Sequence, residues 1–389
     1  MLYIPPEAEH ILSVLRKNGY EACLVGGCVR DMLMDITPHD YDITTSAPPE
    51  ITLSLFEKTV PTGIKHGTVT VIENGTPFEV TTYRSDGKYS DCRRPESVTF
   101  VKSLREDLAR RDFTSNAIAY GGGSDIKDYF GGTEDIKNGI LRAVGDPSLR
   151  FKEDALRILR LFRFASVLGF TPEEKTLKAA LADSPLLRKI SSERILAELE
   201  KALEGKNPAA LKPLTDIGGL DFLGLEKSPD YKKIAALKGT GLSLFGFLYL
   251  SGADVTAALD YLKVPNRTKR LAAKLLTLIS QPFPAEKADI KEMLFLTDPD
   301  AFQKYIIFER LCLDAGTGKA EELFGEIIKN GEPYRICDLK IKGGDLKKLG
   351  TEGEKTGEVL EYLRRTAVKD PSLNKKSLLY EKAAEFIRN

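Results

Sequence analysis

Two aspartates separated by one residue, Asp40 and Asp42, are the part of the sequence best suited to chemistry. They open the stretch DYDITT, whose β-branched residues predict a strand. In a strand, residues i and i+2 point to the same face, so the two carboxylates should project side by side while Tyr41 and Ile43 face the core. Paired carboxylates repel each other, and a hard divalent cation such as magnesium relieves that repulsion. A solvated surface loop is the alternative, and it is the commoner explanation of an isolated Asp-X-Asp.

A glycine pair upstream adds a place for a phosphate. Gly26 and Gly27 follow a strand-like stretch and precede CVRDML, which predicts a helix. Glycines let backbone amides approach a ligand, a helix N-terminus favours an anion, and Arg30 on the first turn can add a charge-assisted contact. With a metal on the aspartates, these parts describe metal-assisted chemistry on a nucleoside triphosphate. Glu79 is a candidate third carboxylate for a two-metal site, although a solvated strand residue or a salt-bridge partner explains it equally well.

Charged residues share one face of a predicted helix. At 100° per residue, four of them fall within about a third of a turn: Glu153, Asp154, Arg157 and Arg160. A carboxylate and a guanidinium three residues apart usually form a surface ion pair. They can instead imitate a complementary base, because Asp154 can accept from a base amino group while Arg157 donates to a ring nitrogen or carbonyl. Cytosine and adenine suit this pair, whereas guanine and uracil invert the pattern and would leave buried groups unpaired.

The elements that must position these residues change character near Asp146. Before it, β-branched runs alternate with turns, and Asn74-Gly75 between two such runs predicts a β-hairpin. A helix between LVGG and YDITT makes this part a mixed α/β unit. After Asp146, runs such as DALRILRLFRFASVL and SSERILAELEKALEG have the 3.6-residue apolar spacing of helices. The sequence therefore predicts a catalytic α/β head followed by an all-helical body.

Length and composition limit the class of protein. At 389 residues the chain is long enough for two to four domains, and 42% hydrophobic and 29% charged residues are typical of a soluble globular protein. No apolar run approaches the roughly eighteen residues of a membrane span, and the N-terminus lacks the pattern of a secretory signal. Five scattered cysteines without a CxxC pair, and only three histidines, exclude a zinc knuckle and favour a reducing cytoplasm. The net charge of zero leaves nucleic-acid binding to local clusters.

Taken in order, the motifs resemble those of class II nucleotidyltransferases, the tRNA CCA-adding enzymes and bacterial poly(A) polymerases. The stretch GGCVRDMLMDITPHDYDITT resembles the family signature, and ARRDFTSNAIAY resembles the ribose-reading motif. DYFGGTEDIKNGILRAVGDP resembles the connector between head and neck, RFKEDALRILRLFRFASVLGF the base-reading helix, and ISSERILAELEKAL the helix that braces it. The resemblance extends from Leu24 to about Leu203, and KIKGGDLKKLG is loosely similar to the tail of the bacterial CCA-adding group.

This resemblance implies a mixed-sheet, polymerase-β-like nucleotidyltransferase head at residues 1–142 and an all-α remainder in a multidomain, elongated protein. The remainder would comprise a neck with the base-reading helix at 143–205, a body at 206–330 and a tRNA-binding tail at 331–389. The implied reaction is template-independent addition of C, C and A to the 3′ end of tRNA, using CTP and ATP and releasing pyrophosphate. The family places two magnesium ions on the residues that match Asp40 and Asp42. The number of subunits stays open, with a homodimer as one alternative.

The resemblance also assigns nucleotide-binding residues. The family uses the residues that match Asp154 and Arg157 as a protein template for the base. Asp112 in RRDFT would accept a hydrogen bond from the ribose 2′-hydroxyl, and Arg111 would hold phosphate or base, whereas an isolated RRD would be read as a solvated charged turn. Further cations within reach of the triphosphate are Arg160 and Arg163.

A basic tail predicts where RNA binds. Residues 335–376 contain eleven Lys or Arg and seven Asp or Glu, a net charge of +4 (11 − 7). GGDLKKLG predicts a glycine turn into a basic helix, and LRRTAVKD adds two arginines. Such a face can track phosphates without reading sequence, as suits a tRNA acceptor arm recognised by shape, although helices solvated by lysine explain it equally well. The candidate RNA-binding residues are Lys342, Lys347, Lys348, Arg364 and Arg365.

Four functions compete. The leading one is the complete CCA-adding reaction, and the others are a poly(A) polymerase, a partial enzyme that adds only CC or only A, and a non-catalytic RNA-binding relative. PTGIKHGTVTVI lacks the basic run usual in the polymerases, and the intact aspartate pair argues against an inactive relative. The polar stretch DGKYSDCRRP predicts a mobile surface loop that refits the pocket from cytosine to adenine, with tRNA contact as its alternative role. Because relatives that stop after CC have a shortened loop here, the full-length stretch predicts addition of all three nucleotides.

Overall fold

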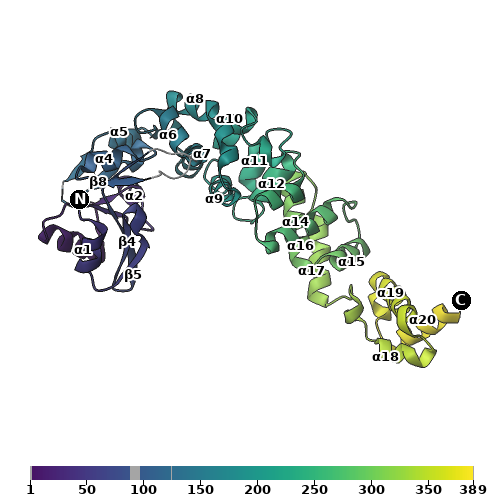
Figure 1. Ribbon diagram of the computed structural model, residues 1–389. Helices are drawn as coiled ribbons and strands as arrows, with labels where there is room; N and C mark the ends of the chain where they lie inside the picture. Colours follow the sequence, from purple (N-terminus) through teal and green to yellow (C-terminus); the bar gives the residue numbers. More distant parts are fainter. Residues whose placement is uncertain (1, 88–96, 124, 389) are drawn as a thin grey trace. The chain divides into compact units, whose positions relative to one another are not determined.

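The structure is a computed structural model that describes residues 2–87, 97–123 and 125–388 (Figure 1). It divides the chain into two compact units, Met1–Ala235 with Leu250–Ala253, and Ala236–Tyr249 with Asp254–Asn389. All the described strands belong to the first unit, and the described regular structure of the second is helical. The boundaries predicted for head, neck, body and tail remain predictions. None of the described helices is long and apolar enough to cross a membrane.

The first unit begins with the predicted α/β head. Its helices are α1 (Pro6–Lys17), α2 (Gly27–Leu33), α3 (Pro49–Leu55), α4 (Leu104–Ala109) and α5 (Gly132–Lys137). The strands of the whole first unit in chain order are β1 (Ala22–Val25), β2 (Ile43–Thr45), β3 (Thr59–Gly63), β4 (Thr68–Glu73), β5 (Thr76–Thr82), β6 (Arg84–Asp86), β7 (Val98–Phe100), β8 (Ile118–Tyr120), β9 (Ile126–Asp128), β10 (Ile140–Leu141) and β11 (Thr171–Pro172).

A seven-stranded mixed sheet in the order β3-β4-β5-β2-β1-β8-β9 forms the base of the head. Within it β2 and β5 run parallel, and the other neighbours are antiparallel. Asn74 and Gly75 form the predicted hairpin between β4 and β5, because both have positive φ (50° and 82°) as a two-residue turn of the right twist requires. The central strand β1 buries all four of its residues. The strands that lead into the site are thus fixed by the core.

The helical part of the first unit corrects one prediction. Its helices are α6 (Pro147–Glu153), α7 (Leu156–Leu168), α8 (Glu174–Ala182), α9 (Ser192–Leu203), α10 (Lys212–Asp216) and α11 (Tyr231–Ala236), and β11 adds a two-residue parallel pair with β10. The single helix expected across residues 150–170 is broken at Asp154, which is extended (φ −134°, ψ 101°). Its side chain accepts from the backbone N–H of Leu156 (3.1 Å), and this local bond competes with a continuous helix. The predicted apolar face is confirmed as buried, at Ala155, Ile158, Leu159 and Phe162.

The second unit contains the remaining helices: α12 (Ser243–Leu250), α13 (Val255–Tyr261), α14 (Asn266–Ile279), α15 (Lys287–Leu296), α16 (Pro299–Cys312), α17 (Gly318–Asn330), α18 (Gly343–Leu346), α19 (Gly353–Lys369) and α20 (Lys376–Arg388). Leu339, Leu346, Leu363 and Leu379 belong to the buried cluster around which its C-terminal part is built. The basic helix predicted after GGD is only one turn, α18, followed by a 3-10 turn at Lys347–Leu349.

Candidate active site

Asp40 and Asp42 precede strand β2, which begins at Ile43, so strand alternation does not orient both side chains as predicted. Ile43 is buried and Tyr41 is half-buried. The carbonyl oxygen of Asp42 accepts from the N–H of Val25 (3.0 Å), which holds this residue against β1. The side chain of Asp40 is 85% exposed, and one of its oxygens lies 3.0 Å from Nδ1 of His39. Asp42 is therefore anchored to the sheet by its backbone, while its side chain, like that of Asp40, reaches solvent.

Glu79 lies beside Asp42 across the parallel strand pair. The register aligns Ile43 with Val80, so the residues before them are neighbours. Burial is the first cause that raises the pKa of the Asp42 carboxyl; Arg111 opposes it, and the charges of Glu79 and Asp40 raise it further. Carboxylates that repel one another in this way are suitable ligands for a hard divalent cation.

The carboxylates fit a cation by their chemistry, although they are not a finished cage. Among residues 2–87, 97–123 and 125–388, no three His, Cys, Asp or Glu side chains are grouped closely enough to hold a metal ion as they are. A cation on Asp42 and Glu79 would attract the carboxylate of Asp40 away from His39 and lower the repulsion among the three.

The glycine turn next to the aspartates has the predicted strand–turn–helix form. Gly26 has φ +82° and directly precedes α2, which begins at Gly27. A Cβ at Gly26 would lie 2.9 Å from Nη1 of Arg111 and 3.9 Å from Oδ2 of Asp42. A side chain here would strain the backbone and displace the guanidinium from the site. Only glycine leaves room for Arg111 beside Asp42.

Arg30, on the first turn of α2, is engaged inside the protein. Its Nη2 donates to Oδ1 of Asp31 (2.7 Å) and its Nη1 to Oδ1 of Asn116 (2.7 Å). The guanidinium carbon lies 5.2 Å from the ring centroid of Phe164. These bonds fix the position of the guanidinium and use three of its five N–H donors.

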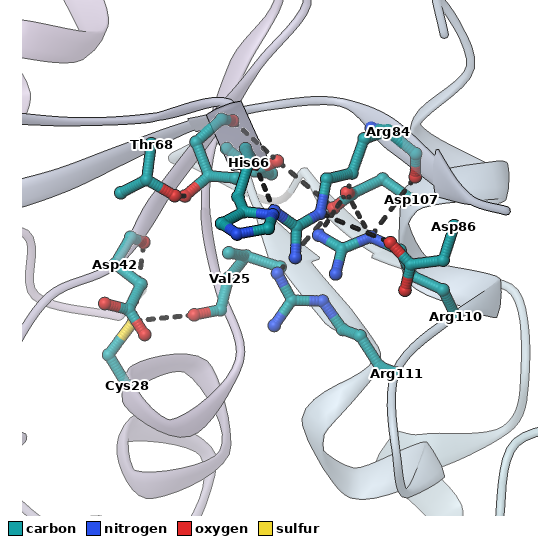
Figure 2. Close-up of polar contacts among 12 residues, drawn as sticks. Val25, Cys28, Asp42, His66, Thr68, Arg84, Asp86, Asp107, Arg110 and Arg111 are labelled. Carbon is teal, nitrogen blue, oxygen red and sulfur yellow. Dashed lines mark hydrogen bonds and ion pairs between the residues drawn. The ribbon is translucent and has the colours of Figure 1, made fainter. Parts of the chain in front are cut away.

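Arg111 lies between Asp42 and helix α4 (Figure 2). Its Nη2 is 3.7 Å from Oδ2 of the buried Asp107. Its Nε is buried and has no hydrogen-bond acceptor among the described residues. Burial lowers the pKa of Arg111, and the charges of Asp107 and Asp42 oppose that effect. A half-buried guanidinium with an unused Nε donor is suited to an anionic or carbonyl oxygen of a ligand.

Asp112 already accepts hydrogen bonds at both carboxylate oxygens. Oδ1 accepts from the N–H of Phe113 (2.8 Å) and from Nδ2 of Asn116 (3.0 Å). Oδ2 accepts from Nε (2.9 Å) and Nη2 (2.6 Å) of Arg160. Burial alone would raise the pKa of Asp112, but Arg160 and Asn116 hold it well below its ordinary value. A ribose hydroxyl could bond to this carboxylate only by exchange with one of these partners.

Asp154 and Arg157 do not form the helix-surface ion pair that was the alternative to base reading. Asp154 accepts from Nη2 of Arg194 on α9 (3.0 Å). Arg157 is buried, and it donates to Oε2 of Glu153 (3.0 Å) and to the carbonyl oxygen of Arg110 (2.8 Å). An acceptor and a donor held by separate partners can each be presented to one edge of a base.

Helix α9 also holds the two other arginines of α7. Glu198 is 2.5 Å from Nε of Arg163 and 3.9 Å from Nη1 of Arg160. Arg163 additionally stacks on Phe164, with its guanidinium carbon 3.9 Å from the ring centroid. These contacts anchor both arginines close to Asp112.

Sequence reasoning missed three charged residues of this network: Asp107, Arg194 and Glu198. The spacing offered a signal in each case. Asp107 precedes Arg110 and Arg111 by three and four residues, the spacing of an ion pair on a helical turn, and Arg194 precedes Glu198 by four, which puts both charges on one face of a helix. What the sequence did not reveal is that these partners face the site.

The predicted RNA-binding residues separate into two groups. Lys342, Lys347 and Lys348 are exposed, and Arg365 is 68% exposed beside Glu361. Arg364 must be withdrawn from the basic surface, because it is only 1% exposed. Its guanidinium donates to Glu292 (2.8 Å) and Glu361 (2.7 Å), and lies 4.0 Å from the ring centroid of Phe295. It is a structural contact between α15 and α19.

The predicted mobile loop, Asp86 to Pro95, lies outside the described residues from Lys88 onward. Its described start belongs to β6, where Asp86 pairs with Val98 of β7.

The chain is similar to known proteins along nearly its whole length. Residues 22–142 match the family described as "Poly A polymerase head domain", and residues 169–224 match "Probable RNA and SrmB- binding site of polymerase A". A CCA-adding enzyme of Leuconostoc mesenteroides is 36% identical over 98% of this chain and 97% of its own. Another from Geobacillus thermodenitrificans is 45% identical over 87% of this chain and 85% of its own. The crystal structure of the Bacillus stearothermophilus CCA-adding enzyme in complex with CTP superposes with a TM-score of 0.82 at 33% identity, covering 99% and 98% of the two chains.

Proposed function

This chain belongs to the family of CCA-adding enzymes and poly(A) polymerases, and on that premise we propose that it adds C, C and A to the 3′ end of tRNA from CTP and ATP, releasing pyrophosphate. The observation that carries the proposal is the match to CCA-adding enzymes over 98% of the chain. The geometry agrees with it, because the first unit brings together carboxylates for a cation, a guanidinium with an unused donor, and an acceptor–donor pair suited to a base. A cytoplasmic location follows from the tRNA substrate.

The reaction of this family depends on a divalent metal ion. We assign two magnesium ions to Asp40 and Asp42, with Glu79 as a further ligand. When bound, such ions neutralise triphosphate charge and activate the RNA 3′-hydroxyl. The chain itself contributes Asp42, fixed to β1 by its backbone, and Gly26, whose missing side chain leaves Arg111 next to that carboxylate.

Base selection is assigned to Asp154 and Arg157. Asp154 would accept from the amino group that cytosine and adenine share, while Arg157 donates to the neighbouring ring acceptor. Arg194 orients the aspartate, and Glu153 with the carbonyl of Arg110 orients the arginine. UTP and GTP would place donors against Arg157 and acceptors against Asp154, so both are rejected.

For RNA, we propose that the exposed tail lysines Lys342, Lys347 and Lys348 contact phosphates. Lys342 also lines a pocket of ≈ 600 Å³, together with Arg335 and Lys340 and with the acidic Glu332 and Asp338. Exposed lysines bind a folded RNA through its backbone without reading bases.

The decisive experiment is primer extension on three tRNA transcripts, ending at the discriminator base, after the first two C residues, or complete. With CTP alone the first should gain two C; with ATP alone the second should gain one A; the complete transcript should gain nothing. Many A residues from ATP alone would identify a poly(A) polymerase. Arrest at CC with both nucleotides present would identify a partial enzyme, and no extension of any transcript would refute the proposed function.

A further inference from the structure

Asp107 is the centre of the polar network around the start of α4 (Figure 2). Its side chain is fully buried. Oδ1 accepts from the backbone N–H of Arg84 (3.3 Å) and from Nη2 of Arg110 (2.7 Å). Oδ2 accepts from Oγ1 of Thr44 (3.2 Å) and faces Nη2 of Arg111 (3.7 Å). One carboxylate thus joins three segments that are distant in sequence.

Each of these partners leads to a different part of the nucleotide site. Thr44 lies on β2, two residues after Asp42. Arg110 presents its carbonyl oxygen to Nη2 of Arg157, the arginine assigned to the base (2.8 Å). The carboxylate of Asp107 therefore fixes the position of β2 relative to the segment that contains Arg110 and Arg111.

Arg111 depends most on this carboxylate. Removing a guanidinium from water is costly unless a negative charge compensates it. Asp42 and Asp112 are its other acidic neighbours, but Asp112 already accepts from Arg160, and a bound cation would compete for the charge of Asp42. Asp107, which forms the ion pair with Arg111, would remain as the counter-charge.

The contact between Asp107 and Arg111 leaves donors unused. At 3.7 Å it is an ion pair longer than a hydrogen bond, and Nε of Arg111 has no acceptor within the described residues. By contrast, Arg110 spends both Nε and Nη2 on the same carboxylate. Arg111 is held in place by charge and remains able to bond a ligand.

We propose that Asp107 is a positioning residue for the incoming nucleotide and acts through Arg111, which it holds beside Gly26 with donors directed at an oxygen of CTP or ATP. The inference rests on the proposed function for the identity of these two ligands. Asp107 itself does not touch the nucleotide.

A double-mutant cycle on nucleotide affinity tests the proposal. We would titrate CTP and ATP, with magnesium and without tRNA, into wild type, Asp107→Asn, Arg111→Ala and the double variant by calorimetry. Each single variant should weaken both nucleotides about tenfold or more, as expected for loss of a charge-assisted bond. The double variant should bind no more weakly than Arg111→Ala, because residues that act as a unit are not additive.

Asp135→Asn is the matched control. Asp135 is another buried head carboxylate that accepts from an arginine, Arg142 (3.1 Å), and from Thr114 (2.7 Å). The Asp135→Asn variant should melt at a lower temperature, and its affinity for CTP and ATP should stay within about twofold of the wild type. The positioning role would be wrong if Asp107→Asn bound CTP and ATP with the wild-type affinity. It would also be wrong if Asp107→Asn lowered these affinities by the same factor with and without Arg111.

Asp107→Glu keeps the cycle informative if the asparagine variant does not fold. It retains the charge and moves it by one methylene, so it should again weaken both nucleotides only when Arg111 is present. Extension of tRNA by the wild type is measured in parallel. Suppose that the four proteins show the non-additive cycle on nucleotide affinity but the wild type extends no tRNA. That result would refute the proposed function and would still support the positioning role of Asp107.

Discussion

At the scale of single residues, the site divides its charged groups into two kinds. Arg30, Arg157 and Arg160 have hydrogen-bond acceptors inside the protein. Arg111 keeps an unused Nε, and no described residue donates a hydrogen bond to the Asp42 carboxylate. The arginines that are bonded inside the protein hold the site together. We expect Arg111 and Asp42, which have unused hydrogen-bonding capacity, to contact ligands.

Asp42→Ala should abolish addition of C and of A alike. Losing a metal ligand removes several kcal/mol of transition-state stabilisation, so kcat should fall by roughly a thousandfold or more. The melting temperature should hold or rise slightly, because the mutation removes repulsion with Glu79 and Asp40. Primer extension and thermal melting measure the two effects, with Glu50→Gln on exposed α3 as the control. Substantial turnover in Asp42→Ala would contradict the metal assignment.

Asp154→Ala should relax the choice of base more than it weakens nucleotide binding. Loss of the acceptor should raise misincorporation of UTP and GTP relative to CTP by about tenfold or more, since a rejected base no longer faces an unpaired carboxylate. Arg157→Ala should reduce both C and A incorporation. Ratios of kcat/KM for the four nucleotides measure this, and unchanged ratios in both variants would reduce the pair to a structural role.

At the scale of elements, buried ion pairs connect the head to helix α7. Asp112 of the ribose-reading motif accepts from Arg160, and Arg160 and Arg163 in turn contact Glu198 on α9. Breaking a buried pair by removing one partner leaves an uncompensated charge, which costs more than the pair itself contributes. The nucleotide contact that we propose for Asp112 and the attachment of the neck helices therefore involve the same carboxylate.

Arg160→Ala should lower the unfolding free energy by about 3 kcal/mol at pH 7, measured by urea denaturation. The pKa of Asp112 lies below its ordinary value when folded, so the wild type keeps this stabilisation above pH 4 and loses it only as pH falls through the folded pKa. In the Arg160→Ala variant, burial raises the pKa of Asp112, so its carboxylate takes up a proton at mildly acidic pH and the cost of an unpaired buried charge disappears. The difference in unfolding free energy between wild type and variant should thus become smaller from pH 7 to pH 4.5. Arg188→Ala, which removes an exposed pair with Asp221, should cost less than about 1 kcal/mol at both pH values.

The predicted loop after β6 gives a prediction for the switch from C to A. Because β6 pairs with β7, a deletion should begin at Lys88 and end at Arg94, so that Asp86 keeps its partner. We expect addition of two C residues to persist and addition of the terminal A to be lost, because the loop is assigned to refitting the pocket for the larger base. Extension of tRNA ending in CC with ATP measures this. Equal loss of C and A addition would make the loop a general binding element.

At the scale of the whole molecule, a net charge of zero is compatible with RNA binding because charge is distributed locally. The tail exposes lysines, whereas its most deeply buried arginine, Arg364, is matched by Glu292 and Glu361. Only the exposed cations are available to phosphates. The correction at Arg364 therefore narrows the proposed RNA surface to Lys342, Lys347, Lys348 and Arg365.

Changing Lys342, Lys347 and Lys348 together to alanine should raise KM for tRNA several-fold and leave the affinity for CTP unchanged. The slope of log Kd for tRNA against log salt should fall by roughly 0.7 to 0.9 for each lysine that contacts a phosphate. Filter binding at several salt concentrations gives the slope. The matched control changes three other exposed lysines of the same unit: Lys238, Lys319 and Lys329. Equal losses in both triple variants would show that the effect is unspecific.

Much of the fold follows from local sequence alone. Asn74-Gly75 determined a hairpin because a two-residue turn needs positive φ, and the apolar period of α7 determined its buried face because that period matches a helix turn. The order of motifs identified the family, and the catalytic candidates Asp40 and Asp42 came from a two-residue spacing. Each hairpin, helix face and motif depends on residues within a few positions of each other, and the order of the motifs can be read directly along the chain.

Tertiary structure decided which charges meet. Asp107, Arg194 and Glu198 looked like ordinary helix-surface charges, and Arg364 looked like part of a basic face, because a helical period does not say what packs against a helix. The break at Asp154 was likewise missed, since the helical period continues through this residue, whereas its carboxylate accepts from the N–H of Leu156 and from Arg194 on α9. Periodicity determines the elements, and long-range pairing of buried charges, which no local pattern encodes, determines the site.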